Sequence, residues 1–92
     1  MIVEICCTSM PSVEAAIMGG ASRLEVCENL LKDGLTPSMS FLGKVIQNTS
    51  LPIHVLIRPR EGNFVYTESE ITTTMNQIEL AKEMGVHGVV VG

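Results

Sequence analysis

The sequence is poor in aromatic residues, with two phenylalanines, one tyrosine and no tryptophan among 92 residues. Its core must therefore be built mainly from aliphatic side chains and methionine, which supply most of the 46% hydrophobic content. It also lacks a run of about 18 or more apolar residues, the length that a membrane-spanning helix needs. Met1 leads directly into apolar residues without a basic leader or a small-residue cleavage site. We expect a cytosolic protein without a membrane segment.

Positive charge is scarce as well: six lysine and arginine residues face ten acidic residues, giving a formal net charge of -4. Beyond Arg58 and Arg60 there is no cluster of basic residues. Nucleic acids and anionic membrane surfaces attract proteins through such clusters. The sequence therefore predicts neither as a main partner.

Three cysteines, Cys6, Cys7 and Cys27, are an odd number for a disulfide framework. In a chain without a secretion signal we expect them to be free thiols. The sequence also lacks a glycine-rich phosphate loop, an HExxH helix, a nucleophile elbow and a CxxC pair. The familiar enzyme and zinc motifs are thus absent.

Short runs of valine, isoleucine and leucine alternate with segments of helical periodicity over the whole length. Apolar runs of this kind are typical of parallel strands covered on both faces. The order βαβαβαβ is compatible with an open doubly wound sheet and with part of an eight-stranded (β/α) barrel. A chain of 92 residues is expected to form one small domain. The expected strands are residues 1–6, 23–27, 52–57 and 88–91, and the expected helices are residues 10–18, 37–48 and 68–84.

Local signals support the helix starts. Ser9 precedes a Met-Pro pair and can cap the first helix. Thr36 precedes a proline in the same way, and Thr67 with Glu70 forms a capping box for the third helix. The third helix is expected to turn one apolar stripe to the sheet, formed by Ile71, Met75, Ile78 and Met84.

Two of the predicted strands repeat a carboxylate and a thiol two residues apart, Glu4 with Cys6 and Glu25 with Cys27. Because side chains alternate along a strand, each glutamate shares a face with its cysteine. Arg58 follows the third strand and supplies a positive charge. The carboxyl ends of parallel strands are where such sheets bind ligands, so we expect these five side chains to converge there.

The thiols of Cys6 and Cys27 are candidate ligands for Cu(I), because soft thiolates favour this ion over hard cations. Cys7 is expected to face the other way, since neighbouring strand residues alternate. The alternative is structural, because a buried cysteine often behaves as a small hydrophobic side chain.

The charged residues suggest two further roles. Glu4 and Glu25, close enough to repel, could have separated pKa values and serve as an acid and base pair in catalysis. Arg58 and Arg60 could clamp a carboxylate or phosphate with their forked donors. The alternative is a buried, charge-balanced layer without chemistry.

Taken together, these motifs make the sequence similar to the copper homeostasis protein CutC family. The similarity lies in the combination of the Glu-x-Cys, GGA-x-R-x-E, G-x-TPS and IRPR patterns. The matching stretches are residues 3–6, 19–27, 34–38, 57–60, 63–66 and 88–92.

The resemblance implies a TIM-type (β/α)₈ barrel in the cytosol with a role in copper homeostasis and copper binding. It also implies that Cys6 and Cys27 are the copper candidates. The residues that would line the barrel mouth are Glu4, Glu25, Arg58 and Arg60.

Members of that family run well beyond a fourth strand, so residues 1–92 would form about half of a barrel. We therefore expect either a fragment of a longer product or a chain that self-associates through its open edge. The favoured interpretation is a copper-binding homeostasis protein. The alternatives are a barrel enzyme that uses the glutamate pair and the arginine clamp on a small anionic metabolite, and a folded remnant without activity.

Overall fold

The computed structural model describes residues 2–28 and 34–91, and within them the predicted order of elements is confirmed. Four parallel strands form one sheet in the order β1-β2-β3-β4. No helix in these two segments is long and apolar enough to cross a membrane. The elements are β1 (Glu4–Cys7), α1 (Met10–Met18), β2 (Arg23–Val26), α2 (Met39–Asn48), β3 (Ile53–Ile57), α3 (Glu68–Glu83) and β4 (Gly88–Val91).

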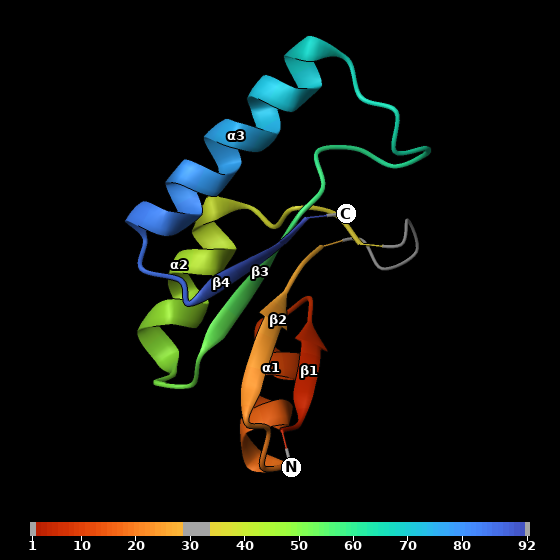
Figure 1. Ribbon diagram of the computed structural model, residues 1–92. Coiled ribbons are helices and arrows are strands. Elements are labelled where there is room, and N and C mark those ends of the chain that lie inside the picture. The colour runs from red at the N-terminus through yellow and green to blue at the C-terminus, as the bar shows by residue number, and fades with distance from the viewer. Residues whose placement is uncertain (1, 29–33, 92) are drawn as a thin grey trace.

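The hydrophobic core lies between the sheet and the helices. Leu24 and Val26 of β2 and Val55 of β3 are fully buried on the helix side, packed with Val13 of α1 and Leu42 of α2. Figure 1 shows α1 and α2 behind the strands, while the face of the sheet turned to the viewer is left open. Helices on a single face form the wall of a barrel, whereas a doubly wound sheet carries them on both faces.

The sequence predicts strands that are covered on both faces, and the structure differs from this prediction. Within the described residues, only one face of the sheet is covered by helices, and side chains on the other face stay partly exposed, among them Glu25 and His54. The apolar runs gave no sign of this, because the open face also carries Leu56 and Val90. The interior of a barrel contains both apolar and polar side chains. The hydrophobic content of the strands alone therefore does not distinguish a barrel from a doubly wound sheet.

Two predicted helix caps are confirmed. Ser9 is the N-cap of α1, and its hydroxyl accepts from the backbone N–H of Ser12 at 3.3 Å. Thr67 caps α3, where the carboxylate of Glu70 accepts from the N–H of Thr67 at 2.9 Å in a capping box. Each cap satisfies backbone donors that the first helical turn leaves free.

The predicted cap at Thr36 is wrong. Ser38 caps α2 instead, and its hydroxyl accepts from the N–H of Phe41 at 3.1 Å. The hydroxyl of Thr36 accepts from the N–H of Arg58 at 2.7 Å and donates to the side chain of Gln77 at 2.9 Å. Thr36 therefore ties the end of β3 to α3, a role set by tertiary contacts that local sequence does not reveal.

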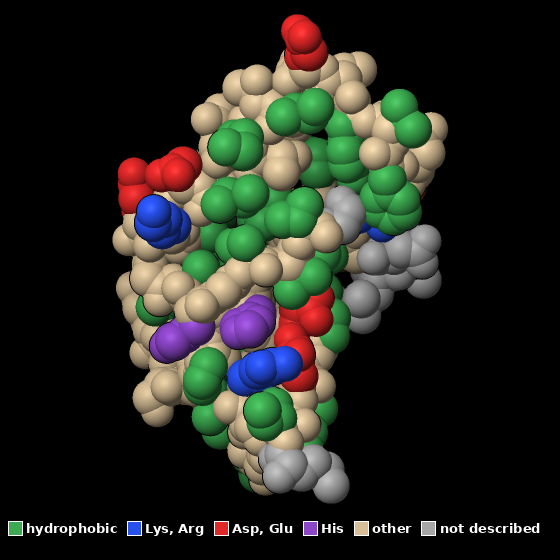
Figure 2. Space-filling model, in the orientation of Figure 1, with side chains coloured by type: hydrophobic (Ala, Val, Ile, Leu, Met, Phe, Trp, Pro, Cys, Tyr) green, Lys and Arg blue, Asp and Glu red, His purple; other side chains and the backbone are tan. Residues whose placement is uncertain are grey.

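Apolar side chains remain exposed along α3 and at the sheet edges. Ile71 and Met75 are 52% and 58% exposed, so the prediction that they belong to the core is wrong, whereas Ile78 and Met84 do pack against it. Figure 2 shows hydrophobic side chains gathered over α3 on the face in view. Exposed valines also mark the edge strand β4, namely Val89, Val90 and Val91.

Replacing Leu24 by alanine should destabilise the fold by about 2–5 kcal/mol, because this fully buried side chain lies on an inner strand and leaves a cavity. The control is Met18→Ala at a side chain that is 89% exposed, which should cost less than about 0.5 kcal/mol. Chemical denaturation measures both. Equal losses in the two variants would contradict the placement of the core.

Candidate functional site

Polar side chains of the first three strands line the open face of the sheet. In the strand register, Glu4 lies opposite Arg23 and Cys6 lies opposite Glu25. Glu25 lies in turn opposite His54 of β3. Figure 2 shows acidic, basic and histidine side chains gathered over the strands on this face. The alternation of side chains thus places the predicted carboxylates and the Cys6 thiol on one surface.

The closest contact on this face joins two thiols. The Sγ atoms of Cys6 and Cys27 lie 2.8 Å apart, and both cysteines are free. Cys6 is exposed on the edge strand β1, whereas Cys27, which directly follows β2, is only 1% exposed. Cys7 faces the helices, is fully buried, and donates its thiol to the carbonyl of Ile5. As expected, the thiols of Cys6 and Cys27 lie together, and the thiol of Cys7 does not join them.

The environment of Cys27 strongly favours its protonated form. Burial, followed by the hydrogen bond with Cys6 and the negative charge of Glu25, raises the pKa of the Cys27 thiol to about 12. Thiolates, not thiols, bind metals and attack electrophiles. A cation that binds this sulfur must therefore displace a proton.

Glu4 forms its ion pair with a different positively charged side chain from the one expected. Arg23 forms an ion pair with Glu4, with its Nη2 atom 2.9 Å from Oε2, whereas the sequence suggested Arg58 for this role. The sequence prediction did not include Arg23, although Arg23 stands two residues before Glu25 and therefore lies on the same face of β2. Burial, followed by the negative charge and hydrogen bond of Glu4, raises the pKa of Glu25, and His54 opposes that rise.

Arg58 lies at the end of β3 and is only 5% exposed. Its guanidinium donates to the carbonyl of Gly34 at 3.4 Å and to that of Gly62 at 3.0 Å. It also lies 5.2 Å from the centroid of the Phe64 ring, within cation–π range. The contacts with Gly62 and Phe64 fold the segment after β3 back onto the end of its own strand, and the contact with Gly34 joins that end to the segment before α2.

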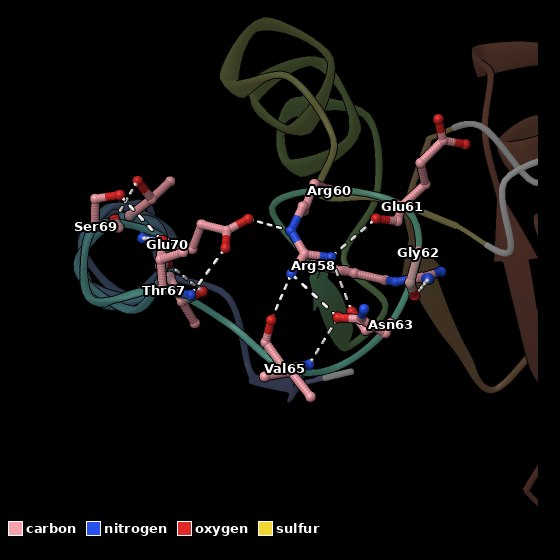
Figure 3. Close-up of polar contacts among 11 residues, drawn as sticks. Arg58, Arg60, Glu61, Gly62, Asn63, Val65, Thr67, Ser69 and Glu70 are labelled. Carbon is pink, nitrogen blue, oxygen red and sulfur yellow. Dashed lines mark hydrogen bonds and ion pairs between the residues drawn. The ribbon is translucent and has the colours of Figure 1, made fainter.

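Arg60 lies within the same loop and contacts several of its groups, as Figure 3 shows. It donates to the carbonyls of Asn63 at 2.9 Å and Val65 at 2.7 Å, and it forms an ion pair with Glu70 at the start of α3. Its guanidinium lies over the ring of Tyr66. The two arginines predicted to clamp an anion are thus engaged with groups of the loop that they belong to and its neighbours.

The thiols of Cys6 and Cys27 are two soft sulfur donors in contact. Within residues 2–28 and 34–91, no group of three or more histidine, cysteine or acidic side chains is arranged to hold a metal ion. A metal–sulfur bond is about 2.3 Å long, so an ion between Cys6 and Cys27 needs the sulfurs farther apart than 2.8 Å. Cys6 lies exposed on an edge strand, where its side chain has room to turn.

The sequence model of the CutC family matches residues 1–92. A protein named CutC from Vibrio campbellii is 41% identical over 90 residues, which cover 98% of this chain and 36% of the relative. A CutC protein from Salmonella newport is 42% identical over 91 residues, which cover 99% of this chain and 37% of the relative.

A solved structure agrees with the sequence matches. The crystal structure of a protein named as copper homeostasis protein CutC from Streptococcus agalactiae superposes with a TM-score of 0.88 at 30% identity, covering all of this chain and 46% of that chain. This likeness confirms the predicted fold class, a TIM-type barrel limited to about its first four strands. The chain spans little more than a third of the curated relatives and under half of the solved one.

The raised pKa of Glu25 predicts how stability depends on pH. A carboxyl whose pKa is higher in the folded state lowers stability as the pH rises from its unfolded pKa through its folded pKa. Glu25→Gln removes this loss, so the variant should gain stability relative to the parent as the pH rises above about 4. Denaturation across this range measures the difference.

The matched control is Glu14→Gln at an exposed position of α1. It removes one carboxylate of the same kind from the helical surface. A pH-dependent gain in Glu14→Gln as large as that in Glu25→Gln would show that total charge, rather than the surroundings of Glu25, causes the effect.

Proposed function

Because this chain belongs to the CutC family, we propose that it acts in copper homeostasis and binds Cu(I) through the sulfurs of Cys6 and Cys27. The observation that carries the proposal is the 2.8 Å contact between two free thiols from neighbouring strands. Thiolates are the protein ligands that Cu(I) prefers. The name of the Streptococcus agalactiae protein links that relative to copper homeostasis.

The two thiols would have different tasks. Cys6 is exposed and can take Cu(I) from a donor molecule in solution, whereas Cys27 is buried and completes the coordination from inside. Glu25 contributes to the raised pKa of Cys27, and the same negative charge would favour a cation bound beside it. Copper is then a cargo, held by two sulfurs and partly neutralised by a carboxylate.

The proposal includes a cytosolic setting, where thiols stay reduced and are ready to bind a metal ion. The cysteines of the described structure are free, which suits such a compartment. An oxidising compartment would convert close thiols to disulfides and remove the ligands.

Acid and base catalysis is the second candidate, and one observation favours it. Burial, followed by the negative charge of Glu4, raises the pKa of Glu25, and a carboxyl that holds its proton to higher pH suits a proton donor. The anion clamp has less support, because Arg58 and Arg60 donate to carbonyl groups around their own loop. Copper binding therefore fits the contacts better than a reaction on an anionic metabolite.

The copper proposal is tested by titrating Cu(I) against a chromogenic chelator under anaerobic, reducing conditions. The parent chain should bind one ion per chain. Cys6→Ser and Cys27→Ala should each lower the affinity by about a hundredfold or more, since each removes one of two ligands. Cys7→Ala is the matched control and should bind like the parent, because Cys7 lies on the other face of the sheet.

The affinity of the parent should also rise at least about tenfold per pH unit between pH 6 and pH 8, because Cys27 gives up a proton on binding. This slope should be lower in Cys27→Ala. Parent-like affinity in a chain that lacks both Cys6 and Cys27 would contradict the thiol site.

We also propose that the chain, taken at the length given, self-associates through its open edges. β1 and β4 are the outer strands of the sheet, and Val90 and Val91 of β4 are 38% and 59% exposed. Unpaired edge strands with apolar side chains tend to pair with another chain.

Sedimentation analysis of the chain should therefore show assemblies larger than a monomer. Val90→Lys should weaken them by placing a charge on the edge. Val65→Lys, on a loop residue that is 79% exposed, is the control and should leave assembly unchanged. A parent chain that stays monomeric at all concentrations, and melts cooperatively, would count against the proposal.

A further inference from the structure

The register of the first two strands brings Cys6 and Cys27 together as diagonal neighbours. Cys6 pairs with Glu25, and Cys27 lies two residues farther along the same face. The N–H of Cys27 donates to the carbonyl of Cys7 at 3.2 Å, which continues the hydrogen bonding between the strands beyond the end of β2. The Sγ atoms are 2.8 Å apart. A disulfide bond is about 2.05 Å long, so the sulfurs need to approach by only about 0.8 Å.

The third thiol is separated from this pair by the sheet itself. Cys7 neighbours Cys6 in sequence, and consecutive strand residues point to opposite faces. Its Sγ is fully buried on the helix side and donates to the carbonyl of Ile5 at 3.6 Å. The three cysteines thus sort into one contacting pair and one isolated thiol.

From this geometry we infer that Cys6 and Cys27 form a reversible intramolecular disulfide, so that the same pair is a redox modification site. The oxidant is a small soluble disulfide such as oxidised glutathione, which can reach the exposed Cys6. Cys27 is buried, so it acts as the resolving thiol, which displaces glutathione from Cys6.

The reaction takes place in two exchange steps. The Cys6 sulfur attacks one sulfur of oxidised glutathione, a mixed disulfide forms, and one glutathione leaves with the proton that Cys6 gave up. The Cys27 sulfur then attacks the Cys6 sulfur, and the second glutathione leaves with the proton from Cys27. The protein pair loses two electrons and two protons, and oxidised glutathione becomes two molecules of reduced glutathione.

Two features bear on the rate and on the return reaction. The high pKa of Cys27 leaves little thiolate at neutral pH, but a sulfur held in contact with its target reacts far faster than one arriving from solution. Cys6 is exposed, so the thiolate of reduced glutathione can attack the bridge at its sulfur and return both cysteines to thiols.

The consequence for copper rests on the proposed function. A disulfide has no thiolate to offer, so oxidation removes both Cu(I) ligands at once. A bound ion would in turn keep the two sulfurs from reacting. Loading with Cu(I) and oxidation are then mutually exclusive states of one pair.

The test uses the reduced, copper-free chain in a series of glutathione redox buffers, followed by quenching with an alkylating reagent and mass spectrometry. The parent should change from three alkylated cysteines to one, with peptide mapping assigning the bridge to Cys6 and Cys27. Cys7→Ala should change from two alkylated cysteines to none. Cys6→Ser and Cys27→Ala should form no internal bridge, and circular dichroism checks that each variant is folded.

Three results would overturn the inference: a bridge between Cys6 and Cys7, linkage only between chains, or a glutathione adduct on Cys6 that persists in the parent. Cu(I) titration of the oxidised chain, with ascorbate to keep copper reduced, should show affinity at least a hundredfold lower, restored by dithiothreitol. A bridge in a chain that never binds Cu(I) supports the redox site and defeats the proposed function. Cu(I) binding by a chain that forms no bridge does the reverse.

Discussion

The parallel register of β1 on β2 is the constraint on which the rest of the structure depends. It sets Cys6 opposite Glu25 and leaves Cys27 on the same face, where the two sulfurs touch. A slip of one residue would turn the whole apolar set of β2, including Leu24, from the helices to the open face. The burial of the core and the meeting of the thiols are therefore two results of a single alignment, and neither can change alone.

Much of this could be read from the sequence because it follows from short-range rules. The alternation of apolar runs with helical segments predicts the order of elements, and the capping box at Thr67 predicts where α3 begins. The Glu-x-Cys repeat predicts that Cys6 and Cys27 share a face while Cys7 does not. Periodicity could not predict that helices cover only one face of the sheet. That arrangement depends on the handedness and curvature of successive crossovers rather than on any one segment.

The interactions that the sequence did not reveal are those that join distant segments. Arg23, not Arg58, pairs with Glu4, because only the register shows which side chains stand opposite each other. The sequence predicts Arg58 and Arg60 as an anion clamp, but it did not reveal that their donors hold the loop after β3 and the start of α3. In the same way Met75 fits the apolar stripe of α3, yet its side chain is 58% exposed.

The central claim is that two sulfurs from neighbouring strands bind Cu(I), and X-ray absorption at the copper edge of the Cu(I)-loaded chain tests it most directly. The account predicts two sulfur atoms as the nearest neighbours of copper, with one of them lost in Cys6→Ser. A first shell made of nitrogen or oxygen atoms, or a sulfur count unchanged when Cys6 is replaced, would contradict it. The thiol contact would then be a packing feature of the barrel wall and not a copper site.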